Sequence, residues 1–205
     1  NADLSGGGAT YIPVGATASI CKEIVDHSPK WKAMVDNVRT TPTLGVQIWL
    51  RPTLAELGMK MADWGMQEGD EPNSVIYADL LYSWTDMDCV LSFEGWRPDV
   101  QPGELSYFCG TWNTGALPPP SDHGFPARER ARLVEVTREW LDRNMGWVFP
   151  RSIVDGKFDL DLLVDPADPE NVRATPGRER LEQQWFVINA APSDHYTLAW
   201  PGTDK

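Results

Sequence analysis

The chain has 205 residues, and thirty acidic residues against eighteen basic ones give it a net charge of −12. That charge argues against nucleic acids and anionic membrane surfaces as partners, because both are bound through clustered Lys and Arg. No run of eighteen apolar residues occurs, so the sequence predicts no transmembrane helix. Residues 1–8 have neither the basic start nor the apolar run of a secretory signal, and we predict a flexible lead-in to a single domain over residues 9–205.

Cysteine and tryptophan contents suggest a compartment and a type of surface. The three cysteines, Cys21, Cys89 and Cys109, form no C-x-x-C pair, and no histidine lies at metal-ligand spacing from them. They are typical of structural thiols in a reducing compartment, so we expect a cytoplasmic protein. The ten tryptophans are typical of a buried core, but an indole N–H also suits a binding cleft. A sugar- or lipid-binding surface is therefore an alternative.

The first elements in chain order are a short strand and two helices. Residues 9–16 read as the strand, and Thr17 is expected to cap the first helix. Ser28 and Pro29 predict the start of the second helix, with serine as the cap and proline in the first turn. Apolar residues then follow at helical spacing and predict a core-facing stripe. These residues are Trp31, Met34, Val35 and Val38.

Residues 40–52 predict the central strand, because Pro42 opens the run and Pro52 closes it. Side chains alternate along it. Leu44, Val46, Ile48 and Leu50 point one way, and Thr43, Gly45, Gln47 and Trp49 point the other. The first set makes an ordinary core face. The second combines small groups with an amide and an indole, which suits the floor of a ligand cavity. A solvent-facing or loop-covered sheet face is the alternative.

The rest of the chain predicts more strands and one long helix. A helical turn is expected at residues 54–57, and strands are expected at residues 74–84, 105–109, 183–189 and 196–200. The long helix is expected from about Phe125 to Asn144, with Gly146 ending it. Helices and strands come in blocks without a β-α-β rhythm. The sequence therefore predicts an α+β fold in which a mixed, largely antiparallel sheet packs against helices.

Known catalytic motifs are absent from the sequence. It has no phosphate loop, no G-x-G-x-x-G and no G-x-S-x-G. His27, His123 and His195 lie in polar segments and are interpreted as surface histidines. Acidic residues from Asp155 to Asp168 suggest a calcium loop, but their spacing puts leucine and valine at required positions, so a solvated charged loop is predicted.

One pair of acids remains a candidate for chemistry. Asp86 and Asp88 would share one face of a strand, where each negative charge raises the pKa of the other carboxyl. Such a pair could serve as a general acid or base. Two isolated acids do not identify a reaction.

Four segments, residues 12–16, 28–38, 47–50 and 196–205, follow one another as a recognisable block. The block resembles the interior of bacterial FAD-dependent oxidoreductases of the flavin amine oxidase and phytoene-desaturase type. The resemblance implies the substrate-binding domain of such an enzyme, with FAD as cofactor. Members of this family open with a glycine-rich dinucleotide fingerprint and close with a Gly-Asp motif, and neither is found in this chain. It is thus expected to be a fragment, a truncated product or one half of a split enzyme.

The same resemblance implies which residues meet substrate and cofactor. Pro13, Val14 and Gly15 would lie where the chain crosses from the FAD domain to the substrate domain, so they would approach the cofactor. The substrate cavity over the flavin would be lined by Gln47, Trp49, Trp84, Trp185 and Asn189. Plain core packing is the alternative for Trp185. No catalytic residue of the family can be carried over to this sequence.

These inferences lead to two hypotheses. The first is the substrate-binding portion of an FAD-dependent oxidoreductase that acts on an amine or an apolar, isoprenoid-like substrate by hydride transfer to flavin, inactive and colourless by itself. Its partners would be the substrate and an FAD-binding domain, or other copies of the chain meeting through exposed apolar surface. The second is a non-catalytic, aromatic-rich module that binds a glycan or a lipid.

Overall fold

The computed structural model describes residues 14–67, 69–70, 72–76, 78–119, 121–190 and 195–198. The chain divides into two compact units, whereas the sequence suggested one domain over residues 9–205. Unit 1 combines the chain up to Thr43 with the chain from Asn189 onward, and unit 2 comprises Leu44–Ile188. Unit 2 is therefore inserted between the two segments of unit 1. The expected lead-in, residues 1–8, lies outside the described residues.

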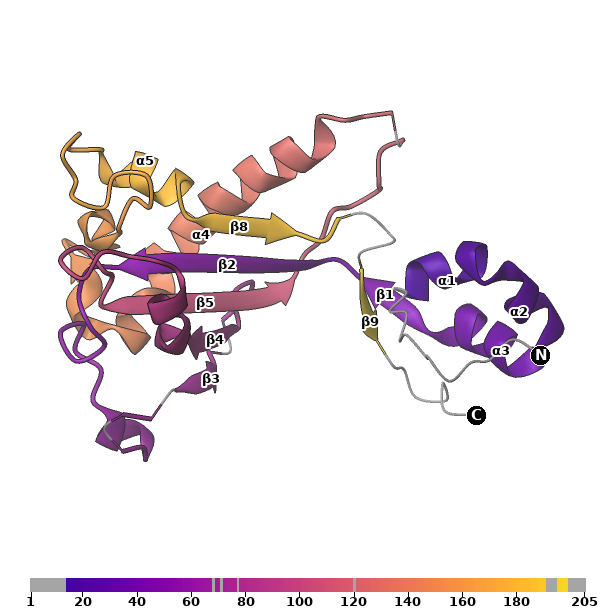
Figure 1. Ribbon diagram of the computed structural model, residues 1–205, viewed down its shortest axis with the longest axis horizontal. Coiled ribbons are helices and arrows are strands. Elements are labelled where there is room, and N and C mark those ends of the chain that lie inside the picture. Colours follow the sequence, from indigo (N-terminus) through magenta and orange to yellow (C-terminus); the bar gives the residue numbers. More distant parts are fainter. Residues whose placement is uncertain are drawn as a thin grey trace. The chain divides into compact units, whose positions relative to one another are not determined.

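The described part of unit 1 contains three short helices and a two-stranded sheet (Figure 1). The helices are α1 (Val14–Ile20), α2 (Lys22–His27) and α3 (Pro29–Asn37), and β1 (Arg39–Thr41) pairs antiparallel with β9 (Tyr196–Leu198). The predicted cap of α3 is confirmed, because Ser28 Oγ accepts a hydrogen bond from the backbone N–H of Trp31 at 3.4 Å. The predicted strand at 9–16 is wrong over 14–16, which are helical, and residues 9–13 lie outside the described part.

Two details of these helices differ from the sequence prediction. Thr17 lies inside α1 rather than at its start, because that helix already begins at Val14. The expected core stripe of α3 is only partly buried, and Trp31 remains 38% exposed. Apolar spacing thus identified α3 as an amphipathic helix without showing how much of its apolar face is covered.

Unit 2 is organised around a five-stranded sheet with the strand order β3-β4-β5-β2-β8. Its strands are β2 (Thr43–Leu50), β3 (Asn73–Val75), β4 (Ser83–Asp86), β5 (Glu104–Thr111) and β8 (Trp185–Ile188). The pairs β3–β4, β4–β5 and β2–β8 are antiparallel. Figure 1 shows β2 and β5 also running in opposite directions. The α+β prediction with an antiparallel sheet is confirmed.

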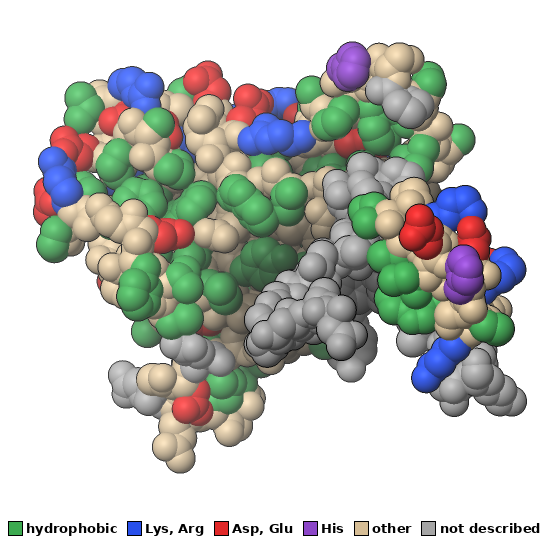
Figure 2. All heavy atoms as spheres, turned by 45° about the vertical axis from the view of Figure 1, so that its right-hand side comes forward, with side chains coloured by type: hydrophobic (Ala, Val, Ile, Leu, Met, Phe, Trp, Pro, Cys, Tyr) green, Lys and Arg blue, Asp and Glu red, His purple; other side chains and the backbone are tan. Residues whose placement is uncertain are grey.

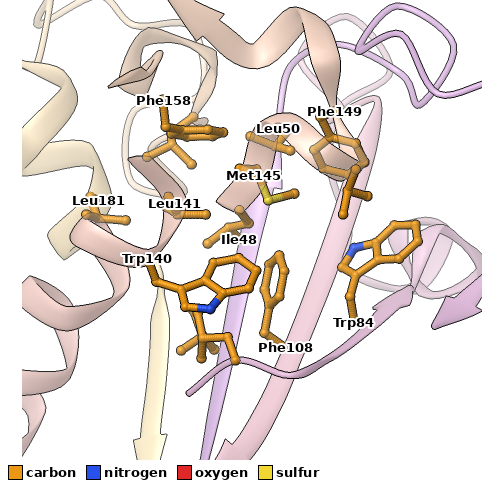
Figure 3. Packing of buried hydrophobic residues seen from close by; sticks show 14 of the residues in the cluster. Ile48, Leu50, Trp84, Phe108, Trp140, Leu141, Met145, Phe149, Phe158 and Leu181 are labelled. Carbon is orange, nitrogen blue, oxygen red and sulfur yellow. The ribbon is translucent and has the colours of Figure 1, made fainter. Parts of the chain in front are cut away.

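One face of this sheet carries the core of unit 2. The predicted core face of β2 is confirmed, since Leu44 is 3% exposed and Val46, Ile48 and Leu50 are fully buried. The long helix α4 (Phe125–Val148) packs against this side. Figure 3 shows Trp140, Leu141 and Met145 of α4 beside strand residues. Phe108 of β5 meets Trp140 edge-on, with ring centroids 5.5 Å apart. We call this side of the sheet the covered face and the other side the open face.

The helix α4 is longer than predicted. It continues past Gly146 to Val148, and a Cβ on Gly146 would lie 2.9 Å from Ile153 Cγ1. Glycine at this position thus allows a neighbouring segment to pack closely instead of ending the helix. Glu129 on this helix is buried, and its Oε2 accepts hydrogen bonds from Trp112 Nε1 at 2.7 Å and from Arg132 at 2.9 Å.

The strand predicted over residues 74–84 is wrong in its extent. Two strands, β3 and β4, pair there instead, and the chain reverses between them. The backbone N–H of Ile76 donates to the carbonyl of Tyr82 at 2.7 Å and closes the reversal. Residues 74–84 are rich in residues that favour strands, so propensity alone predicts one long strand. A reversal that pairs the two halves of this segment gives more of its backbone N–H and C=O groups hydrogen-bond partners.

The chain after α4 is built from short elements. They are the 3-10 helices η3 (Pro150–Ser152) and η4 (Leu160–Leu162), the hairpin of β6 (Ile153–Val154) and β7 (Lys157–Phe158), and α5 (Gly177–Glu182). The acidic segment here is not simply solvated, because Asp165 and Asp168 are buried. Asp168 accepts the backbone N–H groups of Val172 and Arg173 at 3.1 and 2.8 Å, so it fixes the loop.

None of the helices in the described part of the chain is both long and apolar enough to cross a bilayer.

Candidate functional site

The open face of the sheet brings together three of the residues that the sequence singled out. Gln47 and Trp185 are paired residues on the neighbouring strands β2 and β8, and Gly45 is paired with Val187. Paired residues of antiparallel strands point to the same face. Trp49, two residues beyond Gln47, belongs to that face too. Trp185 is 44% exposed, so its indole is not core packing.

Gly45 lies at the centre of a small aromatic cluster on this face. A Cβ at this position would come within 3.1 Å of the Tyr107 hydroxyl and 3.2 Å of both the Trp185 ring and the Val187 side chain. The absence of a side chain at Gly45 therefore allows the three groups to converge over β2. Burial, with a smaller contribution from Cys109, raises the pKa of Tyr107, so its hydroxyl stays protonated and can donate a hydrogen bond at neutral pH.

Glu94 joins the far end of the open face to a loop. Its Oε2 accepts hydrogen bonds from the indole N–H groups of both Trp49 and Trp96, each at 2.7 Å. Its Oε1 accepts from Gln47 Nε2 at 3.3 Å. The two indole rings meet edge-on with centroids 6.2 Å apart. One carboxylate thus sets the orientation of two tryptophans and an amide.

A cavity of about 640 Å³ opens beside these indoles. Its lining combines Trp49, Glu94, Gly95, Trp96, Arg97, Val100, Pro166, Pro169 and Glu170. We call it the Glu94 pocket. Arg97 forms ion pairs with Glu170 and, at 3.2 Å, with Asp99, which ties the two loops together. A volume of this size is in the range of small-molecule sites.

The backbone of Trp49 is held by groups outside the sheet. Its N–H donates to Gln184 Oε1 at 2.9 Å, and its carbonyl accepts from the Val164 N–H at 2.9 Å. Gln184 is buried, and its Nε2 donates to the carbonyls of Val164 and Arg180, both at 2.8 Å. Gln184 directly precedes β8, so these bonds hold β2 beyond the last pair of the β2–β8 ladder and fix the backbone that carries the Trp49 indole.

The structure separates the other predicted site residues from this face. Trp84 is fully buried on the covered face, where its indole packs edge-on against Phe149 with centroids 5.6 Å apart. Asn189 belongs to unit 1, and its Nδ2 donates to Thr43 Oγ1 at 3.0 Å. Of the residues expected near the cofactor, Val14 and Gly15 begin α1, and Pro13 lies outside the described residues.

Sequence reasoning missed Glu94, Trp96 and Tyr107. A signal was present, because Phe93-Glu94-Gly95-Trp96 places a large indole and a carboxylate beside a glycine in a turn. Nothing in the local pattern, however, says that this turn folds back over β2.

Comparison with protein-family models, with curated proteins and with solved structures finds no match for this chain. Its site is therefore interpreted from its own chemistry. The open face offers an amide, a protonated phenol and exposed indoles, which bind and orient a ligand rather than supply a nucleophile.

Proposed function

We propose that this chain is the substrate-binding portion of an FAD-dependent oxidoreductase that acts on an amine or an apolar, isoprenoid-like substrate. The open face would form one wall of the substrate cavity. Gln47 and Tyr107 would orient the substrate, and the apolar ring surface of Trp185 would shape the space. FAD, which accepts the hydride in such enzymes, would be bound by residues outside these 205. Because the residues that bind FAD would lie outside it, this chain would be inactive and colourless by itself.

The observation that carries the proposal is the exposed aromatic cluster over Gly45. A sheet face that is merely packed beneath other segments does not require a glycine at its centre. Here the glycine at position 45 allows Tyr107, Trp185 and Val187 to converge above the strand. Hydrophobic side chains extend across the visible middle of unit 2 in Figure 2, with charged groups largely toward its edges. Exposed apolar surface of this kind marks ligand or domain contacts.

The order of the chain also supports the proposal. The segments that resemble the cofactor side of these oxidoreductases, residues 12–16 and 196–205, belong to unit 1, and Gln47, Trp49 and Trp185 belong to unit 2. The residues expected to line the substrate cavity on β2 and β8 thus fall in one compact unit, as a common cavity wall requires.

The test begins with the gene. We expect the reading frame to continue on both sides, with a glycine-rich dinucleotide fingerprint upstream and a Gly-Asp segment downstream. The complete protein should carry one FAD per chain, read by absorbance at 450 nm, and this absorbance should bleach when an amine or isoprenoid substrate is added without oxygen. Stop codons directly on both sides, or a complete protein without flavin, would contradict the proposal.

Variants of the complete protein locate the substrate. Gln47→Ala and Trp185→Ala should lower kcat/KM for flavin reduction about tenfold or more, with flavin content unchanged. Trp147→Ala is the matched control, because Trp147 lies on α4 and is 84% exposed. Equal losses in all three variants would place the substrate elsewhere.

A second candidate, a module that binds a glycan, is favoured by the Glu94 pocket. Two indoles held at an angle beside a carboxylate offer an apolar surface for a sugar ring and acceptors for its hydroxyls. Tryptophan fluorescence of the 205-residue chain titrated with oligosaccharides tests it. Saturable quenching that is lost in Trp96→Ala would favour this function over the oxidoreductase.

A further inference from the structure

Three carboxylates converge at one end of β4 and β5, away from the Glu94 pocket. Asp86 ends β4, Asp88 begins the 3-10 helix η2 (Asp88–Phe93), and Glu104 begins β5. Each offers one oxygen, and these oxygens lie within 4.8 Å of one another. Asp86 and Asp88 were noticed in the sequence as a pair. The third member, Glu104, comes from a strand that is distant in the chain.

Glu104 has an oxygen that the protein leaves unsatisfied. The residue is fully buried, and its Oε2 has no hydrogen-bond partner among the described residues. Its Oε1 accepts from Ser106 Oγ at 2.5 Å, and that Oγ in turn accepts from Trp84 Nε1 at 2.9 Å. This chain of donors fixes the carboxyl group, and it leaves Oε2 for some other positive partner.

The other two carboxylates are held as acceptors by the backbone. Asp86 Oδ1 accepts from the N–H of Asp88 at 2.8 Å, and Asp88 Oδ1 accepts from the N–H of Leu105 at 2.6 Å. Hydrogen bonds from the backbone stabilise the ionised form of a carboxyl group. The cluster is therefore prepared to carry negative charge on both aspartates.

The electrostatics of the cluster call for a positive charge. Burial, followed by the negative charge of Asp88 and then that of Asp86, raises the pKa of Glu104 to about 9. A buried carboxylate beside two others is strongly unfavourable unless it gains a proton or a metal ion. Asp88 is only half-buried, so an ion from solvent can reach the group.

We propose that Asp86, Asp88 and Glu104 bind a hard divalent cation, with Ca²⁺ as the best fit. The ligands are all carboxylate oxygens, which Ca²⁺ prefers. Ca²⁺ accepts oxygen ligands in flexible geometry, whereas Mg²⁺ demands a near-ideal octahedral arrangement. Water would complete the coordination on the side of Asp88. The site is independent of the proposed oxidoreductase function.

The experiment uses the 205-residue chain after removal of metals with EDTA. Tb³⁺, a luminescent substitute for Ca²⁺, is added and excited through tryptophan, because Trp84 is linked to Glu104 through Ser106. We expect a saturable signal for one ion per chain, displaced by millimolar Ca²⁺, and a higher Tm in Ca²⁺ than in EDTA. Glu104→Gln and Asp88→Asn should each weaken Ca²⁺ binding at least tenfold.

The control variant is Asp63→Asn, which removes the same charge from an exposed position on η1 (Met61–Trp64). Its Ca²⁺ affinity should equal that of the wild-type protein. Circular dichroism shows whether each variant is folded. If Glu104→Gln does not fold, Asp88→Asn still tests the site, because Asp88 is less buried than Glu104 and its substitution disturbs the core less. An absence of saturable Tb³⁺ binding would overturn the proposal and leave a proton as the partner of Glu104. Equal binding by wild-type protein and both site variants would also overturn it.

Discussion

The two faces of the sheet in unit 2 are made by alternate residues of the same strands, yet they are built differently. On the covered face, Val46 and Ile48 are fully buried beneath α4. On the open face, Gly45 and Gln47 leave room, and Trp185 remains 44% exposed. The indole N–H of Trp49 on the open face donates to the exposed carboxylate of Glu94, whereas the indole N–H of Trp84 on the covered face donates to the buried hydroxyl of Ser106. Buried packing is concentrated on the covered face, whereas the open face keeps an exposed indole and half-buried polar groups.

The largest effect is expected when one aromatic residue on each face is truncated and the losses in the free energy of unfolding are compared. Phe108→Ala should lower the free energy of unfolding by about 3–5 kcal/mol, because it leaves a cavity beside Trp140 that the core cannot fill. Trp185→Ala should cost only about 1–2 kcal/mol, since part of the ring is already in water. Urea denaturation measures both. Equal losses would mean that the open face is part of the core.

The second test concerns charge on the covered face. The pKa of Glu104 rises from 4.5 to about 9 in the folded protein, so between these values the folded state holds one more proton than the unfolded state. The contribution of Glu104 to stability is therefore largest at low pH and falls as the pH rises toward 9, with a slope of at most about 1.4 kcal/mol per pH unit. Denaturation in EDTA between pH 5 and 9 measures it. Glu104→Gln should flatten the slope, and an unchanged slope would contradict the assignment.

The third test removes the charge that organises the Glu94 pocket. Glu94→Gln should change the near-ultraviolet circular dichroism of tryptophan, because an amide cannot accept from Trp49, Trp96 and Gln47 together. The cost in stability should be about 1 kcal/mol or less, since Glu94 is exposed. Glu170→Gln is the matched control in the same pocket, because Glu170 forms an ion pair with Arg97 and not a hydrogen bond with an indole. A tryptophan signal that changes equally in both variants would show that Glu94 does not set the indoles.

The smallest expected effect comes from Gly45→Ala. The added methyl group would lie 3.1–3.2 Å from its neighbours, but Trp185 can move outward, so stability should change by less than about 1 kcal/mol. The fluorescence of Trp185 should shift more than the stability does. In contrast, Gly103→Ala would place a Cβ 2.6 Å from the backbone oxygen of Arg51, which cannot move, and should cost a few kcal/mol. A large loss at Gly45 would show that the open face is rigid.

Sequence periodicity predicted the parts of the fold that depend on which side of an element is buried. The alternation around Val46 and the cap at Ser28 are local properties, and the structure confirms both. The reversal between β3 and β4 was missed, because residues 74–84 have the composition of a single strand and only pairing makes them two. Gly146 shows the same limit, since a glycine that ends a helix and one that admits a neighbour look alike in sequence.

The candidate site was predictable only where it lies on one strand. Alternation placed Gln47 and Trp49 on one face, and it correctly set them apart from Val46 and Ile48. Glu94 reaches them from a turn that comes 45 residues after Trp49, so no local pattern relates the two. Glu104 likewise meets Asp86 through strand pairing, and it adds a third, buried carboxylate to a pair of acids that carried little information alone.

The crossing between the two units has a consequence for how such a protein can be assembled. The chain enters unit 2 at Leu44 and leaves it at Ile188, and these two residues are direct partners on β2 and β8. Partners on antiparallel strands have Cα atoms only about 5 Å apart. Residues 44–188 thus begin and end at nearly the same point in space. A module whose two ends lie side by side can be inserted into a loop of a host protein, or replaced by a different module, without separating the host segments on either side.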